Sequence, residues 1–184
     1  MTKIKLIIPK IEELYYRKKL LEDKDTMSYN QGFDLDIKGY DKETGIIIKT
    51  DEELENWYYK WVNNEPNRFY YYIYDTEKNK YVGEIYCYYN SDLDMYDTGV
   101  IVESINRGNN YCYESLIEFE RIVFEEYNIN ALSDIIPIDR VGAIKSFKKA
   151  GFKETELIKE EYVFGEKQLA KQLLITREDY LNRR

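Results

Sequence analysis

The chain has 184 residues, of which 43% are apolar and 34% charged, with a net charge of −8 and no histidine. This composition predicts one soluble globular domain over residues 1–184. It excludes intrinsic disorder and a membrane-spanning helix, which needs about 20 consecutive apolar residues. The negative charge argues against a nucleic-acid partner, and the lack of histidine excludes Ser–His–Asp triads, Cys–His pairs and histidine-ligated zinc.

Two cysteines, Cys87 and Cys112, are too few for a disulfide framework. No signal peptide precedes Ile4. We therefore expect free thiols, a cytoplasmic location, no membrane partner and no bound metal. The sequence leaves open whether the chain forms a homodimer.

The first third of the chain places one long irregular stretch between predicted elements. Lys3–Ile8 predicts a strand, and Pro9 favours the first turn of a helix with an apolar stripe at Ile11, Leu14, Tyr15 and Leu21. Residues 24–49 are too long for a mere connection, so they form either a functional loop or a small hairpin. Thr50 and Glu53 make a capping box before a helix with apolar residues Leu54, Trp57, Tyr58 and Trp61.

The remaining elements are predicted in the order β-β-β-α-β-α-β-β. Phe69–Tyr74 and Tyr81–Tyr89 form an antiparallel hairpin, and a turn at 90–94 leads into the strand that contains Val100–Val102. A helix follows from Tyr113, with Leu116, Phe119, Val123 and Tyr127 on its apolar face, and then a strand at Ala131–Ile138. The next helix contains Ile144 and Phe147 and ends at Gly151. The last element is a hairpin of Phe152–Phe164 and Gln168–Thr176. This order predicts a mixed α/β sheet with helices on both faces.

The segment between the strand at 100–102 and the following helix has the features of an anion site. Asn106-Arg-Gly-Asn-Asn110 is a polar turn with one cation, and Asn109 and Asn110 tolerate the left-handed backbone that shapes such a turn. The first helical turn adds unpaired N–H groups and the positive end of the helix dipole. The alternative is an ordinary strand-to-helix connection without a ligand.

Three segments resemble the GNAT acyl-CoA N-acetyltransferases. Arg107-Gly-Asn-Asn-Tyr-Cys-Tyr-Glu-Ser-Leu116 is similar to that family's pyrophosphate loop, and Ala143-Ile-Lys-Ser-Phe-Lys-Lys-Ala-Gly-Phe152 to its following helix. Asp97-Thr-Gly99 and the C-terminal hairpin resemble the Rim-type branch, which includes ribosomal-protein N-acetyltransferases. The resemblance implies a single-domain α/β (α+β) GNAT-like fold, with a mixed, largely antiparallel sheet of six to seven strands and helices on both faces.

The resemblance also implies roles for individual residues. The backbone of Val100, Ile101 and Val102 would pair with the pantetheine arm of acetyl-CoA, and a backbone N–H there would stabilise the oxyanion. The loop residues that would hold the pyrophosphate are Arg107, Gly108, Asn109, Asn110, Tyr111 and Cys112. Asp97 is the candidate general base that deprotonates the attacking ammonium, and the alternative is a solvated strand end.

Four positions depart from the family pattern. Asn110 and Cys112 stand where the family usually has Gly and Gly or Ala, although Asn can adopt the required backbone and Cys is small. Phe147 replaces the tyrosine that many members use to protonate the departing thiolate, although a thiol with a pKa of about 8.5 can leave without that help. Arg140 stands near a cofactor-contacting Asn of the family.

The stretch between Lys80 and Arg107 contains no Lys or Arg, yet it has five acidic residues: Glu84, Asp92, Asp94, Asp97 and Glu103. It predicts negative potential beside the thioester and hence a cationic amine acceptor, such as a polyamine, an aminosugar or a basic peptide N-terminus. The alternative is that an acidic protein has acidic stretches by chance.

Three functions follow from these features. The first is an acetyl-CoA-dependent N-acetyltransferase that acts on a small cationic amine or a peptide or protein N-terminus. The second is a GNAT-fold CoA-binding or sensor protein with little turnover, because of Phe147 and Asn110. The third is an α/β nucleotide-phosphate binder, which ranks last because the chain lacks a Walker lysine and a complete G-x-G-x-x-G.

Overall fold

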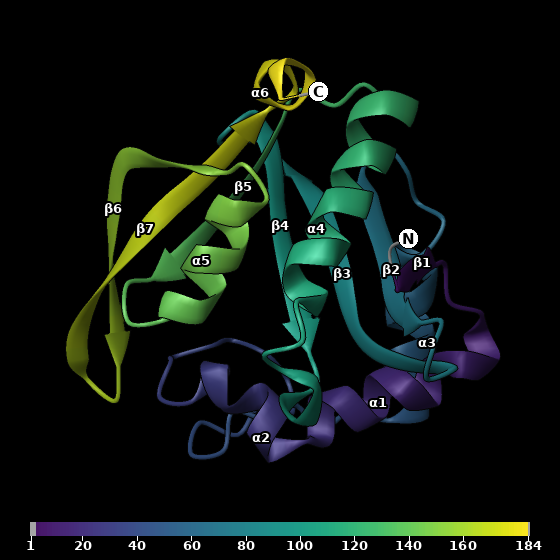
Figure 1. Ribbon diagram of the computed structural model, residues 1–184. Coiled ribbons are helices and arrows are strands. Elements are labelled where there is room, and N and C mark those ends of the chain that lie inside the picture. The colour runs from purple at the N-terminus through teal and green to yellow at the C-terminus, as the bar shows by residue number, and fades with distance from the viewer. Residues whose placement is uncertain (1–2, 184) are drawn as a thin grey trace.

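A seven-stranded mixed sheet with helices on both faces forms the protein in the computed structural model, which describes residues 3–183 (Figure 1). The strands are β1 (Ile4–Ile7), β2 (Arg68–Asp75), β3 (Lys80–Asn90), β4 (Met95–Val102), β5 (Ala131–Pro137), β6 (Lys153–Val163) and β7 (Glu166–Thr176). The helices are α1 (Leu14–Glu22), α2 (Lys24–Met27), α3 (Asp51–Trp61), α4 (Tyr111–Arg121), α5 (Val141–Lys149) and α6 (Arg177–Asn182).

The strand order across the sheet is β1-β2-β3-β4-β5-β7-β6. All neighbours are antiparallel except β4 and β5, which run parallel. The predicted mixed and largely antiparallel sheet is therefore confirmed, as are the 50–53 capping box and the two hairpins. Across residues 3–183, no helix combines the length and the apolar character needed to cross a bilayer.

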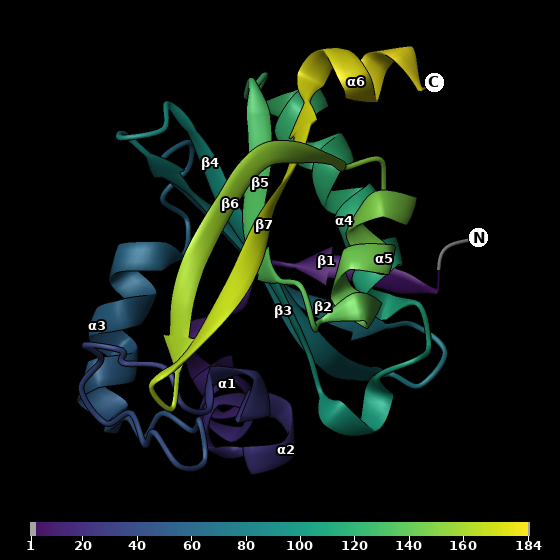
Figure 2. The same ribbon diagram turned by 90° about the vertical axis from the view of Figure 1, so that its left-hand side faces the viewer.

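The helices divide between the two faces of the sheet, as Figure 2 shows, with α4 and α5 on one side and α1 and α3 on the other. The first side packs Leu116, Phe119 and Val123 of the α4 region against the sheet. The second side is aromatic: Tyr16 of α1 contacts Tyr72 of β2. Each face therefore has its own core, and the sheet separates them.

Three details of the predicted helices were wrong. Tyr16 rather than Tyr15 lies in the core, with exposed fractions of 4% and 65%. A 3-10 turn at Ile11–Glu13 precedes α1 and shifts its buried face. Helix α4 begins at Tyr111 instead of Tyr113, and it continues as a π-helical turn at Ile122–Glu126, which leaves Tyr127 exposed.

Residues 24–49 form short helical turns followed by a closed loop. Helix α2 and a 3-10 turn at Ser28–Asn30 come first. A single antiparallel bridge between Tyr40 and Ile47 then closes the loop, in place of a regular hairpin. Ser28, Tyr29, Gln31 and Phe33 of this segment line the same cavity as residues of β4 and β5.

Candidate active site

Strands β4 and β5 part inside the sheet. They pair at only two positions, Tyr96 with Leu132 and Asp97 with Ser133. Beyond Asp97, β4 continues through Val102 with β3 as its only strand neighbour. A strand edge without a neighbour leaves backbone N–H and C=O groups free to bond another extended chain. The sheet therefore contains an open edge in its middle.

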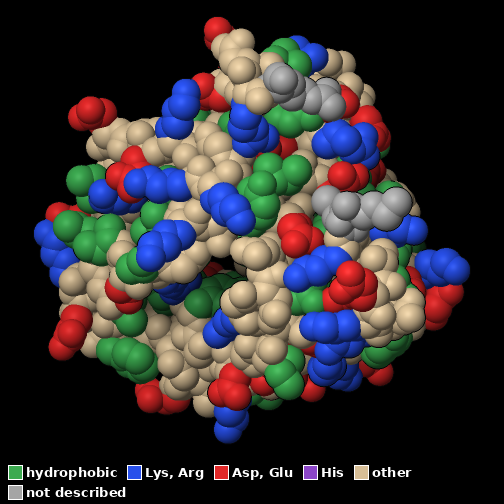
Figure 3. All heavy atoms as spheres, in the orientation of Figure 1, with side chains coloured by type: hydrophobic (Ala, Val, Ile, Leu, Met, Phe, Trp, Pro, Cys, Tyr) green, Lys and Arg blue, Asp and Glu red, His purple; other side chains and the backbone are tan. Residues whose placement is uncertain are grey.

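A cavity of about 790 Å³ fills the gap between the two strands. Its walls are Thr98–Ile101 of β4, Asp134–Pro137 of β5, the start of α5 and the segment around Tyr29. Figure 3 shows the opening as a deep hollow near the centre of the molecule, with basic side chains beside it. This cavity is large enough for an extended organic ligand along β4.

Two segments from opposite ends of the chain meet over one side of the cavity. The N–H of Phe164, at the tip of the β6–β7 hairpin, donates to the carbonyl of Gly32 at 2.7 Å. Gly32 has a φ of +81°, and a Cβ there would lie 2.5 Å from the Phe164 ring. Only glycine fits this position, and the contact roofs the cavity on the side of Tyr29.

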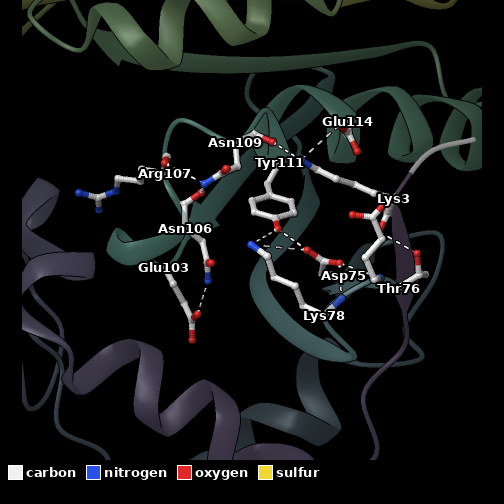
Figure 4. A network of polar contacts seen from close by, with 11 residues as sticks. Lys3, Asp75, Thr76, Lys78, Glu103, Asn106, Arg107, Asn109, Tyr111 and Glu114 are labelled. Carbon is white, nitrogen blue, oxygen red and sulfur yellow. Dashed lines mark hydrogen bonds and ion pairs between the residues drawn. The ribbon is translucent and has the colours of Figure 1, made fainter.

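The loop between β4 and α4 has left-handed backbone at Asn110, as the sequence predicts, but the second such residue is Gly108 and not Asn109. Gly108 and Asn110 have φ values of +81° and +62°, and a Cβ at Gly108 would meet no atom within 4 Å. The Asn109 amide donates to the carbonyls of Asn106 and Arg107, and the Lys3 ammonium donates to the Asn109 carbonyl at 2.7 Å (Figure 4). The loop is held in shape by the protein itself.

Some of the predicted cofactor-binding residues line the cavity and others support the loop. The lining residues among them are Val100, Ile101, Arg107, Cys112 and Phe147. Val102, Gly108, Asn109 and Asn110 lie at its margin, outside the lining. Tyr111 turns away from it, and its hydroxyl donates to Asp75 and accepts from Lys78 (Figure 4). The tyrosine thus anchors the start of α4.

Arg107 extends away from Tyr111 (Figure 4). Its guanidinium donates to the carbonyl of Thr26 in α2 at 2.7 Å. The side chain is exposed and forms no ion pair with another residue of the 3–183 range. It borders the cavity directly before the first turn of α4. A cation next to a helix N-terminus is well suited to bind a phosphate group.

Two cavity side chains limit the chemistry of the site. Phe147 is 2% exposed and packs against Phe152, with ring centres 4.8 Å apart, and its side chain has no acidic proton to donate. Burial raises the pKa of the Cys112 thiol to about 12. Because the thiolate is the nucleophile, this cysteine is unreactive near neutral pH.

Asp97 lies where β4 and β5 still touch, outside the cavity lining. One of its carboxylate oxygens accepts from the Asn90 amide at 2.7 Å, and the other from the Ser133 hydroxyl at 3.1 Å. One oxygen thus joins β4 to β3 and the other joins β4 to β5. Its role as general base stays a prediction, and this placement favours a different carboxylate.

Asp134, which sequence reasoning missed, lies on β5 and lines the cavity. Burial raises its pKa to about 7, and the nearby charge of Asp97 adds to this shift. A group with this pKa is present in both protonation states near neutrality. Its signal in the sequence was the polar Ser133-Asp134 pair inside the otherwise apolar strand 131–137.

Two of the five carboxylates predicted to form a negative edge at residues 80–107 are paired with cations, whereas Asp92, Asp94 and Asp97 form no ion pair among residues 3–183. Glu84 is 1% exposed and pairs with Arg17 at 2.5 Å. Glu103 is 5% exposed and pairs with Lys19 at 2.8 Å. Both cations come from α1, which the sequence alone does not place beside β3 and β4.

Comparison with known proteins identifies the fold. No model of a known protein family matches the chain, and no curated protein sequence matches it. Among solved structures, the spermidine N-acetyltransferase of Vibrio cholerae in complex with CoA and spermine has a TM-score of 0.77 at 16% identity, over 98% of this chain and 99% of that one. A GNAT-family acetyltransferase from Bacillus anthracis has a TM-score of 0.72 at 13% identity, over 96% of both chains.

These neighbours do not single out the Rim-type branch. Within residues 3–183, no group of three or more Cys, Asp or Glu side chains is arranged to hold a metal ion. The chain has the GNAT fold.

Proposed function

We propose that the protein is an acetyl-CoA-dependent N-acetyltransferase that acts on a primary amine. The observation that carries this proposal is the open edge of β4 beside a cavity that reaches the Arg107 loop. Such an edge binds an extended chain with amide groups, and the loop binds phosphate. Structural neighbours named as a spermidine N-acetyltransferase and a GNAT-family acetyltransferase support the same function.

The residues present fit acetyl-CoA, which would supply an acetyl group activated as a thioester. Backbone groups of Val100, Ile101 and Val102 on the open edge would bind the pantetheine amides. Gly108, Asn109, Asn110, Tyr111 and Cys112 carry the backbone of the loop and of the first turn of α4, which together with Arg107 would hold the pyrophosphate.

Asp134 would take the proton of the ammonium, because an amine needs its lone pair to attack a carbonyl carbon. Its pKa of about 7 lets it accept a proton near neutral pH and release that proton again. The amine nitrogen then bonds to the acetyl carbon, the carbon–sulfur bond breaks, and the sulfur leaves with the electron pair. The nitrogen releases its second proton to solvent, which completes the amide. A backbone N–H of β4 would stabilise the oxyanion.

The absence of an acid at Phe147 is compatible with turnover, because a thiol with a pKa of about 8.5 leaves readily as the thiolate. The same absence supports the second candidate, a CoA-binding or sensor protein with little turnover. Phe147→Tyr should change the rate by less than about tenfold.

The proposal is tested by two measurements on the same protein. Acetyl-CoA should raise the melting temperature, because a ligand that binds only the folded state stabilises it. Arg107→Glu should reduce this shift, while Lys5→Glu, the same charge reversal at an exposed site on β1, should leave it intact. Thiol release with an amine then identifies an enzyme. Binding without release for every amine identifies the CoA-binding alternative.

A further inference from the structure

Arg140 reaches across the cavity from the start of α5. Its guanidinium lies over the rings of Tyr29 and Phe33, 5.4 and 5.7 Å from their centres. It also donates a hydrogen bond to the Tyr29 carbonyl. All three residues line the cavity on the side that the β6–β7 hairpin roofs.

This cation forms no ion pair within 4.0 Å among the residues described from 3 to 183. Three carboxylates, Asp139, Glu161 and Asp134, act on Arg140 from a distance, but none of them lies within 4.0 Å of it, and Glu161 pairs with Lys159 at 3.4 Å. Burial lowers the pKa of Arg140, yet guanidinium keeps its charge in proteins. Of its five N–H donors, one has a partner among residues 3–183.

The cavity thus carries an unpaired guanidinium and, on β5, the carboxyl group of Asp134. A polycation such as spermidine would bring several positive charges next to Arg140, which costs binding energy in a partly buried site. An amine that also bears an anion would place one charge against each group. Guanidinium binds carboxylate and phosphate with two parallel hydrogen bonds.

The roof limits the size of such a molecule. The hydrogen bond from Phe164 to Gly32 joins the hairpin tip to the segment that carries Tyr29 and Phe33. The ring of Phe164 and the side chain of Val163 fill the space where a side chain at residue 32 would lie. A short acceptor fits below this contact more easily than a folded protein terminus.

We infer that the acceptor is a small amine that also carries an anionic group, a carboxylate or a phosphate, and that Arg140 binds this group. This inference rests on the proposed function for the identity of the reacting end. Arg140 then determines specificity, and Asp134 faces the ammonium. The acceptor differs in charge from the spermine named in the Vibrio cholerae complex.

Matched pairs of amines test the inference, because each pair differs in the anionic group alone. The probes are β-alanine against β-alaninamide and O-phosphoethanolamine against ethanolamine, with spermidine as the polycation. Calorimetric binding to the CoA-loaded protein and thiol release from acetyl-CoA are both measured. The variants are Arg140→Gln, Arg140→Lys and Lys145→Gln, which removes an exposed charge from the same helix.

We expect the native protein to bind at least one anionic amine about tenfold or more tightly than its neutral match. Arg140→Gln should reduce this ratio to about threefold or less by weakening the anionic amine, with the KM of acetyl-CoA unchanged. Arg140→Lys should keep part of the preference, and Lys145→Gln all of it. The pair that shows the preference distinguishes carboxylate from phosphate.

Three results would overturn the inference. These are equal binding of both members of each pair, tightest binding of spermidine, and a loss in Arg140→Gln that falls on acetyl-CoA instead of the amine. Selective binding of an anionic amine without thiol release for any amine would have another meaning. It would support the role of Arg140 and contradict the proposed function.

Discussion

Arg17 and Arg140 both lie against aromatic rings, and they differ in what else they touch. Arg17 on α1 is 3.8 Å from the centre of the Trp57 ring and donates to Glu84 at 2.5 Å and to the Tyr70 hydroxyl at 3.0 Å. Arg140 has the rings and a carbonyl but no carboxylate within ion-pair distance among residues 3–183. A buried cation with its own counter-ion holds the fold together, whereas one without a counter-ion is available to a ligand.

The largest effect should come from Asp134, the carboxyl group that shares the cavity with Arg140. Asp134→Asn should lower kcat by about 10²- to 10⁴-fold, because the amide cannot accept the ammonium proton. In the native protein, kcat/KM should fall as the pH drops below about 7, and this fall should be absent from the residual activity of the variant. A pH–rate profile of both proteins measures this.

Stability provides the control for that variant. The folded pKa of Asp134 lies above its ordinary value, so the carboxyl group favours the folded state at low pH and this contribution is lost as the pH rises through about 7. Asp134→Asn should therefore raise the melting temperature at about pH 8. If Asp134→Asn melts at a lower temperature than the native protein and keeps its kcat, both expectations are contradicted. Asp97 would then again be the candidate general base.

Arg17→Met should destabilise the protein by about 3–5 kcal/mol, because it leaves the Glu84 carboxylate buried without its cation. Urea unfolding measures the loss. The double variant with Glu84→Gln should recover part of it, since the uncompensated charge is then gone. A loss of stability below about 1 kcal/mol would show that the Arg17–Glu84 pair does not stabilise the fold more than Arg140 does.

A third arginine allows a test of pH dependence outside the site. Arg183 pairs with Glu120, which is 0% exposed and has its pKa raised to about 7 by burial, against the opposing effect of Arg183. Arg183→Met should cost about 1–3 kcal/mol at about pH 8, where the carboxylate is charged. The cost should be smaller at about pH 5.5, where Glu120 is protonated. An equal loss at both pH values would assign the effect to packing.

Arg140→Gln should have the smallest effect on stability, below about 1 kcal/mol, because no carboxylate loses a partner. Thermal unfolding of Arg140→Gln and Arg17→Met under the same conditions compares the two losses of stability. A loss as large as that of Arg17→Met would mean that Arg140 serves the fold, and its proposed role in binding would then have to be abandoned.

The sequence predicts much of the fold because local patterns determine the elements. The Thr50–Glu53 capping box and the aromatic and β-branched runs of the hairpin at 69–89 require no information about distant contacts. The π-helical turn at 122–126 and the exposure of Tyr15 depend on packing against the sheet, so the helical period alone misplaces them. The motif at 107–116 located the loop, because its backbone conformation depends on nearby Gly and Asn residues.

The chemistry of the site was harder to predict because it depends on neighbours that are remote in sequence. Asp97 and Asp134 are both acidic residues in strands, and only the pairing of β4 with β5 shows that Asp97 bonds to Asn90 and Ser133. Likewise, Glu84 looked like a source of negative potential until α1 placed Arg17 beside it. Burial and pairing, which set the pKa and the net charge of a site, are properties of the fold.

The contact between Gly32 and Phe164 has a consequence for the order of folding. Residues 28–33, which line the cavity beside Arg140, are synthesised early. The hairpin tip that contacts them joins strands β6 and β7, near the end of the chain. Closing so long a loop is slow compared with forming local structure. The binding site should therefore mature last, and a nascent chain that lacks β6 and β7 should bind no acceptor even after β1–β4 have paired.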